Sequence, residues 1–146
     1  MLPPKLPLNL IPSTSWWKNV RSKISQSQWD TIRKKVYQKA NYTCEICQTK
    51  NTRLDCNEVW TYKDNRQILI RLEAICRQCH LTQHMGYAST IGKQQEAFNH
   101  LLKVNGWSGE QGKIYVQKKF AEWEKRSKIE WVLDYEILEE YLKTKN

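Results

Sequence analysis

Proline and glycine are scarce in this chain of 146 residues, with four and five copies respectively. All the prolines lie within the first 12 residues, and no cluster of proline and glycine divides the chain after about residue 15. Internal repeats and low-complexity segments are absent as well. Because linkers between domains are commonly rich in these residues, their absence favours one compact unit after the opening segment.

Long hydrophobic runs are also missing. No apolar stretch approaches the roughly 20 residues that a membrane-spanning helix needs. The opening MLPPKLPLNLIP is apolar, but it holds every proline and no small-residue cleavage site follows it, which argues against a signal peptide. A cytoplasmic protein with no membrane association is therefore expected.

Acidic residues are scarce in the first part of the chain. Residues 1–53 hold ten Lys and Arg against two acids, and the net charge of the whole chain is +9. Such an excess favours phosphate backbones through counterion release, although a merely solubilising surface is the alternative. The last 18 residues reverse the balance, with five acids against two lysines.

Aromatic residues, in contrast, are plentiful, since the chain contains seven tryptophans and is 40% hydrophobic. That content and the length suffice for one domain with a core plus an appendage. Trp29, Trp123 and Trp131 have apolar neighbours at helical or strand spacing, which favours the core over base stacking. Trp60 fits either role.

The patterning divides the chain into three parts. Residues 1–26 form an extended, proline-rich basic arm that should pack on the rest, with Trp16 and Trp17 as its anchor. Residues 27–90 form a helix and the zinc-braced core described below, and residues 91–146 form a helical extension packed on that core.

Periodicity and turn signals predict the individual elements. SQWD resembles a capping box that starts the first helix at Ser27, and KDNR is a turn between two runs of strand formers. A short helix should then carry His80 and His84 on one face and end near Gly86. The expected elements are a helix over about 28–40, strands over 53–62 and 67–75, the short helix, helices over 93–104 and from Ser108 to about 128, an extended piece over 129–133, and a final acidic helix capped by Asp134.

Four of the five cysteines form two CxxC pairs, CEIC and CRQC, with 28 residues between them. This spacing lets both sulfurs of a pair face one ion, and thiolate is the ligand that structural Zn²⁺ prefers. The alternatives are two disulfides, which are unusual in the cytoplasm, and a redox CxxC, which does not need two copies. The pairs therefore predict one structural zinc, with Cys44, Cys47, Cys76 and Cys79 as its ligands.

The order CxxC, hairpin, LxxxCxxCHxxxH resembles that of the HNH endonucleases. Further stretches resemble a bacterial branch of HNH-like proteins: IPSTSWWKNVRS, NEVWTY in place of a more usual His-Glu-Val-Trp, LEAICRQCHLTQHMG, VNGW and RSKIEWVLDY. The resemblance covers the chain from about Ile11 to Tyr141. It implies an α+β fold with a small ββα-metal (HNH, or His-Me finger) centre, a bracing four-cysteine zinc site, and α-helices before and after this centre.

The resemblance also implies a reaction, in which a Mg²⁺-like ion between strand and helix and a general-base His cleave a phosphodiester. His80 matches the ligand on the helix, although it could instead bond to the zinc knuckle. Asn57 falls at the strand ligand and Glu58 at the base, while Arg71 replaces a middle Asn. A neutral Asn binds cations weakly, and an exposed Glu, with a pKa of about 4.3, is a poor base unless burial raises that value. Cleavage is therefore expected to be slow or absent.

Other side chains near these positions have less specific expectations. His84 could supply a further imidazole or ligand, or lie on the helix surface. Cys56 is expected to be a buried, unreactive thiol, and His100 to be structural. The candidate phosphate contacts, taken as a group, are Arg33, Lys34, Lys35 and Lys39 on the first helix, Lys63 and Arg66 at the hairpin turn, and Arg77 at the second cysteine pair.

Two functions follow from these features. The first is an HNH-type, zinc-containing protein that binds nucleic acid, double-stranded DNA in particular, and cleaves it weakly with Mg²⁺ or another divalent cation. The second is an inactive HNH fold that serves as a DNA-binding or protein-interaction module of a larger complex. The acidic last helix suits the second, since it could dock on a basic partner or on the chain's own basic half.

Overall fold

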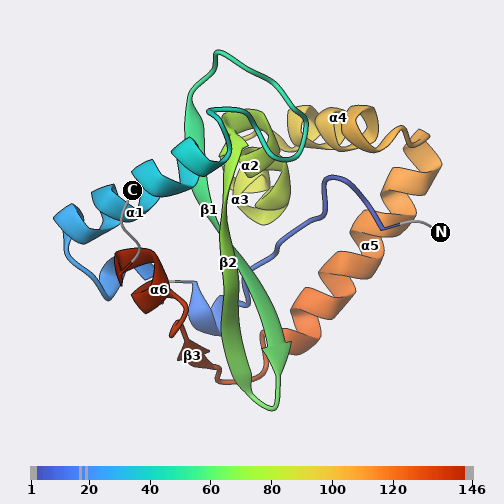
Figure 1. The fold of residues 1–146 in the computed structure, drawn as a ribbon. Helices are drawn as coiled ribbons and strands as arrows, with labels where there is room; N and C mark the ends of the chain where they lie inside the picture. The colour runs from blue at the N-terminus through green and yellow to red at the C-terminus, as the bar shows by residue number, and fades with distance from the viewer. Residues whose placement is uncertain (1–2, 17, 19, 144–146) are drawn as a thin grey trace.

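A long β-hairpin forms the centre of the molecule, with helices on both sides of it (Figure 1). The computed structural model describes residues 3–16, 18 and 20–143. The hairpin strands are β1 (Leu54–Lys63) and β2 (Arg66–Cys76), and a short strand β3 (Val132–Asp134) pairs in parallel with β2. The sheet order is β1-β2-β3, so the expected α+β class is confirmed.

The hairpin forms because two runs of strand-forming residues flank a turn whose left-handed backbone conformation Asp and Asn tolerate. Lys63 pairs with Arg66, and the two residues between them, Asp64 and Asn65, have positive φ angles of 51° and 62°. A two-residue turn of this kind matches the twist of the flanking strands. The predicted strands are thus confirmed to within one residue at each end.

Helix α1 (Gln26–Lys39) lies beside the hairpin and starts two residues before the predicted position. The Ser25 hydroxyl accepts a hydrogen bond from the Gln28 N–H at 3.1 Å, and Gln28 Oε1 accepts one from the Ser25 N–H at 2.9 Å. The predicted cap at Ser27 is therefore wrong, because Ser25 and Gln28 make the reciprocal capping box instead. The buried side chains of this helix are Trp29, Ile32 and Val36.

Two short helices replace the single helix that was expected to carry both histidines. Helix α2 (Arg77–Gln83) ends before His84, whose φ of −101° and ψ of 55° are not helical, and α3 (Met85–Thr90) follows directly. The predicted end at Gly86 is wrong, since this residue lies inside α3. His84 therefore stands at a helix break, although its N–H still donates to the His80 carbonyl at 3.2 Å and the two side chains share a face as predicted.

Helix α4 (Gln94–Asn105) packs on α2 and α3, α5 (Gly109–Arg126) follows it, and the N-terminal arm passes between α5 and the hairpin (Figure 1). Ser108 caps α5 as predicted. The arm is bound at several points and, as expected, packs on the rest. It also contains two 3-10 turns, Ser13–Ser15 and Val20–Ser22, while Trp17, its other expected anchor, lies outside the described residues.

Long-range hydrogen bonds fix the arm. The Leu6 backbone exchanges two bonds with the Asn105 side chain, at 3.1 and 3.0 Å, and the Asn9 N–H donates to the Gln83 carbonyl at 2.9 Å. Leu6 and Leu8 are buried in the core that also holds side chains of α1, the hairpin, α4 and α6. All three parts of the chain thus share one core.

The acidic last helix, α6 (Leu138–Lys143), packs against the basic helix α1. The Lys35 ammonium group donates to the Tyr141 carbonyl at 2.7 Å, and the Tyr141 hydroxyl accepts from the Leu72 N–H at 3.1 Å. Asp134 does not cap this helix as predicted, because it belongs to β3. Within the described ranges, no helix combines the length and apolar character needed to cross a bilayer.

Candidate metal centre and adjoining cavity

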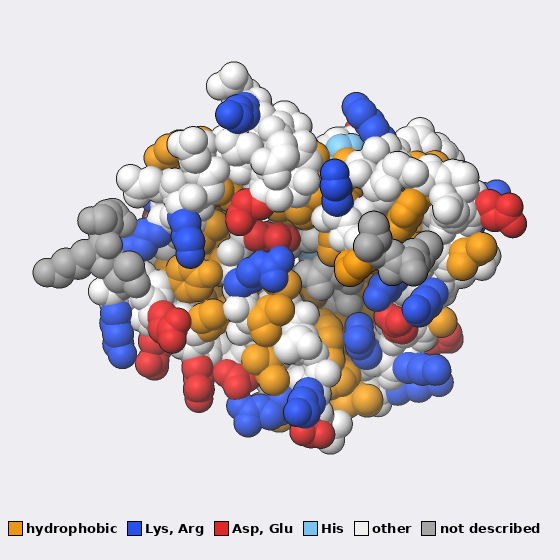
Figure 2. Space-filling model, turned by 45° about the vertical axis from the view of Figure 1, so that its right-hand side comes forward, with side chains coloured by type: hydrophobic (Ala, Val, Ile, Leu, Met, Phe, Trp, Pro, Cys, Tyr) orange, Lys and Arg blue, Asp and Glu red, His pale blue; other side chains and the backbone are white. Residues whose placement is uncertain are grey.

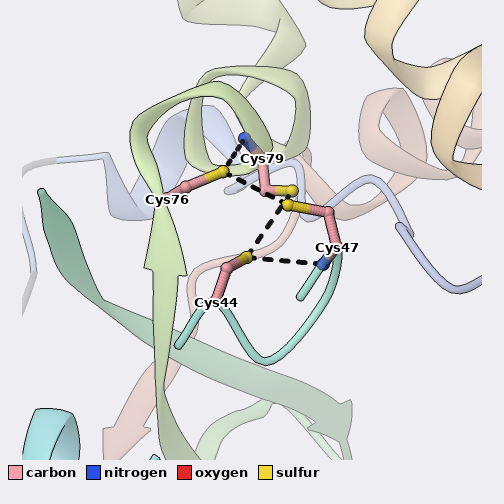
Figure 3. Close-up of side chains that lie close together, drawn as sticks. All are labelled: Cys44, Cys47, Cys76 and Cys79. Atoms are coloured by element: carbon pink, nitrogen blue, oxygen red, sulfur yellow. Dashed lines mark hydrogen bonds between the residues drawn. The ribbon is translucent and has the colours of Figure 1, made fainter. Parts of the chain in front are cut away.

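Four cysteine side chains converge where the loop before β1, the end of β2 and the start of α2 meet (Figure 3). The sulfurs of Cys44 and Cys79 are 3.9 Å apart, those of Cys47 and Cys76 are 3.7 Å apart, and all four lie within 4.8 Å of one another. Sulfurs in a tetrahedral zinc site, with bonds of about 2.3 Å, are roughly 3.8 Å apart. The predicted ligands are therefore brought together and fit a metal ion such as zinc.

Backbone N–H groups stabilise the thiolate form of two of the sulfurs. The N–H of Cys47 donates to Cys44 Sγ, and that of Cys79 to Cys76 Sγ, each at 3.4 Å. Such bonds favour the thiolate, which is the form that binds metal. His100 of α4 also approaches the cluster, with Nε2 3.3 Å from Cys79 Sγ. The sequence predicted a structural His100 but not this contact, because helix spacing does not show what α4 faces.

A second polar pair joins the edge strand β1 to α2. His80 Nδ1 is 3.0 Å from Asp55 Oδ2. A carboxylate at Nδ1 sets the tautomer and orientation of an imidazole and leaves Nε2 to bind a metal ion or accept a proton. The side-chain partner of His80 is thus Asp55 rather than the cysteine knuckle, and Asp55 is a site residue that sequence reasoning missed.

His84 adds a neutral imidazole to this pair. Its ring meets the His80 ring edge to face, with centroids 4.9 Å apart. Burial and, to a smaller extent, the neighbouring His80 lower the pKa of His84 to about 4. The His84 ring is therefore uncharged at pH 7, so it can act as a ligand or proton acceptor but not as a cation.

Asn57, the predicted strand ligand, is buried, with 2% of its surface exposed. Its amide nitrogen donates to Glu73 Oε1 at 3.0 Å and to Gln83 Oε1 at 2.6 Å. Both amide hydrogens are thus engaged, so the carbonyl oxygen is the atom with which Asn57 would bind a cation. Neither partner was predicted, because β2 and α2 bring them to Asn57 from 16 and 26 residues away.

Glu58, the predicted base, points to the opposite face of β1 from Asn57, as consecutive strand residues do. Its Oε1 accepts a hydrogen bond from the Val20 N–H at 2.9 Å. Burial raises the pKa of Glu58, against the opposing effects of the Val20 N–H and the Arg21 charge. The condition under which Glu58 becomes a better proton acceptor, burial that raises its pKa, is therefore met.

A cavity of about 780 Å³ connects these side chains. It lies between the hairpin, the arm, α3 and α5, and its polar wall includes Asn57, Glu58, His80 and His84. Cys56 also lines it, and burial raises the pKa of this thiol to about 12, in agreement with the predicted unreactive cysteine. Lys18 and Arg21 line the cavity too, although neither was among the predicted phosphate contacts.

Among the described residues, the cavity wall holds no preformed cluster of charged or imidazole metal ligands. Apart from the four cysteines, no group of three or more His, Cys, Asp or Glu side chains in the described part of the chain brings its ligand atoms together. The position where a middle Asn is expected holds Arg71, which pairs with Glu73 at 3.4 Å. The Asp55–His80 pair and the Asn57 carbonyl are thus what this wall offers to a cation.

The predicted phosphate contacts do not form one group beside His80. Lys63 and Arg66 lie at the hairpin turn, at the end remote from the cysteines, and Lys34, Lys39 and Arg77 are exposed. On the face shown in Figure 2, Lys and Arg side chains are scattered among acidic and hydrophobic ones. Three of the predicted phosphate contacts have partners within the chain: Arg33 with Asp30 at 2.9 Å, Lys35 with the Tyr141 carbonyl, and Arg66 with Asp134.

Comparison of the chain with models of protein families, with curated proteins and with solved structures finds no match. The site geometry is therefore what bears on function. The loop before β1, the end of β2 and α2 bring together a four-cysteine cluster, and α2 also carries an oriented imidazole at the wall of a large cavity.

Proposed function

We propose that this chain is a zinc-containing, HNH-type nucleic-acid-binding protein that binds double-stranded DNA and hydrolyses its phosphodiesters slowly with a divalent cation. The observation that carries this proposal is the Asp55–His80 pair, with Nδ1 and Oδ2 3.0 Å apart at the cavity wall. The order of two strands, a helix and two cysteine pairs agrees with the sequence resemblance to HNH endonucleases.

Zinc is the ion proposed for the four cysteines, because four thiolates at tetrahedral spacing suit a closed structural zinc site. A reducing, cytoplasmic environment would keep these thiols available for the metal. In this role the ion joins the loop before β1 to the start of α2, so it holds in place the helix that carries His80.

The catalytic ion would be Mg²⁺ or a similar cation held by His80 and the Asn57 carbonyl. Such an ion polarises a phosphodiester and lowers the pKa of bound water. The neutral His84, whose ring adjoins that of His80, is the candidate proton acceptor. Glu58, with its raised pKa, lines the same cavity from the opposite face of β1. A neutral amide in place of a charged ligand weakens ion binding, which is why the proposed reaction is slow.

Nicking of supercoiled plasmid by zinc-loaded protein with Mg²⁺, Mn²⁺ or Ni²⁺ tests the proposal. Slow nicking is expected, with none in His80→Ala and a decrease of roughly tenfold or more in Asp55→Asn. Asp64→Asn removes the same charge at the exposed hairpin turn and should leave the rate unchanged. An unchanged rate in His80→Ala, or no retention of DNA at moderate salt, refutes the proposal.

A second candidate is a catalytically inactive HNH fold that acts as a DNA-binding or protein-interaction module of a larger complex. The engagement of Asn57 by Glu73 and Gln83, together with the Val20 N–H bond to Glu58, favours it. Retention of DNA without nicking by any of the three cations is the result this candidate predicts. If Asn57→His then restores nicking, the site is a decayed nuclease site.

The acidic helix α6 bears on the second candidate. Its packing on α1 agrees with docking on the chain's own basic half. Docking of an external basic partner would involve the exposed acids of this region, such as Glu136 and Glu139. Charge reversal at these two positions should then release the partner and leave DNA retention unchanged.

A further inference from the structure

One end of the cavity carries buried polar groups that phosphodiester cleavage does not use. Gln67 of β2 has 0% of its surface exposed, and neither its amide nitrogen nor its amide oxygen has a hydrogen-bond partner among the described residues. Ser15 is 1% exposed, and its hydroxyl also has no hydrogen-bond partner among the described residues. Both residues line the cavity. Because buried polar groups are nearly always satisfied, these atoms point to a polar ligand.

Aromatic side chains form the walls around these groups. Trp60 of β1 and Phe120 and Trp123 of α5 line the cavity, and Trp16, which follows Ser15, lines it while keeping 56% of its surface exposed. The indole N–H groups of Trp16 and Trp123 both donate to the Ile11 carbonyl at 2.8 Å. The two rings are therefore held in fixed orientations by the same point of the arm.

This combination of groups defines the chemistry of a ligand. The volume of about 780 Å³ lies within the range of roughly 300 to 1,000 Å³ found for small-molecule sites. Aromatic walls favour a flat ring that can stack on them. The Gln67 amide offers a donor beside an acceptor, which complements the donor and acceptor on the edge of a nucleobase.

We infer that this end of the cavity binds an unpaired nucleobase of the nucleic acid whose phosphate lies near His80. The inference rests on the proposed function. Asn57 and Tyr62, the cross-strand partner of Gln67, are five residues apart on β1, so the two ends of the cavity are separated by roughly 16 Å along the strand. Lys18 and Arg21 line the same cavity and supply positive charge for the strand that connects them.

The inferred pocket predicts a preference among nucleic acids. Moving a base out of the stack costs free energy, and the cost is smallest when the base is already unpaired. Stacking on an aromatic side chain then favours binding by roughly five- to 160-fold for one base. DNA with an unpaired base should therefore bind more tightly than a fully paired duplex of the same sequence.

The test compares two duplexes that differ at one position. One contains 2-aminopurine opposite an abasic site, and the other contains it in a normal pair with thymine. The wild-type protein should bind the first at least fivefold more tightly and should change its 2-aminopurine fluorescence, because the base moves from the DNA stack to the protein. Free deoxyadenosine monophosphate should compete at least 100-fold more weakly than this duplex.

Two variants and a matched control identify the pocket. Gln67→Met and Trp16→Ala should each reduce the preference to twofold or less without changing affinity for the paired duplex. Trp16 follows Ser15 and is 56% exposed, so its removal leaves the core intact. Tyr42 is 60% exposed and lies outside the cavity lining, so Tyr42→Ala should keep the preference.

The outcomes separate this inference from the proposed function. Equal binding of both duplexes overturns the inference and leaves the function standing. A preference that both Gln67→Met and Trp16→Ala retain also overturns the inference. Competition by the free nucleotide at the affinity of the duplex would overturn it too, and would identify a nucleotide pocket instead. No retention of either duplex overturns the proposed function and the inference together.

Discussion

Replacing Gln67 by methionine should make the protein more stable. The Gln67 side chain is fully buried, and its amide nitrogen and oxygen have no hydrogen-bond partner in the described part of the chain. A buried polar group without a partner costs about 1–3 kcal/mol. Methionine has a similar length and no hydrogen-bonding requirement. The free energy of unfolding should therefore rise by about 1–3 kcal/mol, which for a chain of this size corresponds to a Tm increase of roughly 2–10 °C.

Gln83→Met is the matched control for this change. Gln83 is also buried, with 2% of its surface exposed, but its amide oxygen accepts a hydrogen bond from Asn57 at 2.6 Å. Its replacement leaves an amide hydrogen of Asn57 without a partner and should lower the free energy of unfolding by about 1–3 kcal/mol. Urea unfolding of the zinc-loaded proteins, without nucleic acid, measures both changes.

Opposite signs for the two variants support the argument, whereas equal destabilisation refutes it. In the second case the Gln67 amide is already satisfied in the folded chain, for example by an ordered water, and no ligand is needed to explain it. A stabilising Gln67→Met that also loses the preference for an unpaired base would show that the residue is kept for binding rather than for folding.

Three further predictions concern the metal centre and Glu58. Cys79→Ser should reduce bound zinc from one equivalent to less than half by metal analysis and unfold the hairpin and α2 by circular dichroism, because Cys79 is fully buried. His100→Phe should lower zinc affinity by roughly 10–100-fold in a chelator competition, since it removes the contact with Cys79 Sγ. The raised pKa of Glu58 means that the folded state binds more protons than the unfolded state between the two pKa values, so stability falls as pH rises through that interval. Glu58→Gln should therefore raise the urea midpoint at pH 7 and leave it unchanged below the unfolded pKa of about 4.3.

Each of these has a result that contradicts it. Full zinc content in Cys79→Ser would remove the four-thiolate site, and unchanged affinity in His100→Phe would make the imidazole contact irrelevant to the metal. An equal change in the urea midpoint at both pH values would mean that Glu58→Gln acts through packing rather than through the charge of the carboxylate.

Elements with local signals could be predicted from the sequence. The hairpin was found because Asp64 and Asn65 suit its turn, and the four cysteines because CxxC spacing is tied to metal geometry. Helix α5 was found from its cap at Ser108 and its apolar periodicity. The break at His84 was missed, since no proline or glycine precedes it and the helical pattern continues through it.

The partners of the site residues could not be predicted, because they come from distant parts of the chain. Asp55 meets His80 across 25 residues, and Val20 meets Glu58 across 38. The alternation of side chains along a strand does predict that Asn57 and Glu58 point to opposite faces. The resemblance to the HNH family, in which two adjacent residues serve one site, led to the opposite expectation. Burial of Glu58 depends on the arm, whose path along the hairpin is set by tertiary packing.

The most direct test of the account is the rate of plasmid nicking by zinc-loaded protein in Mn²⁺, with wild type and His80→Ala compared at equal DNA retention. We expect slow nicking by the wild type and none by the variant, because His80 supplies the oriented imidazole at the cavity wall. Equal rates for the two proteins, or no nicking by either, would contradict the assignment of a metal-dependent nuclease site to this cavity.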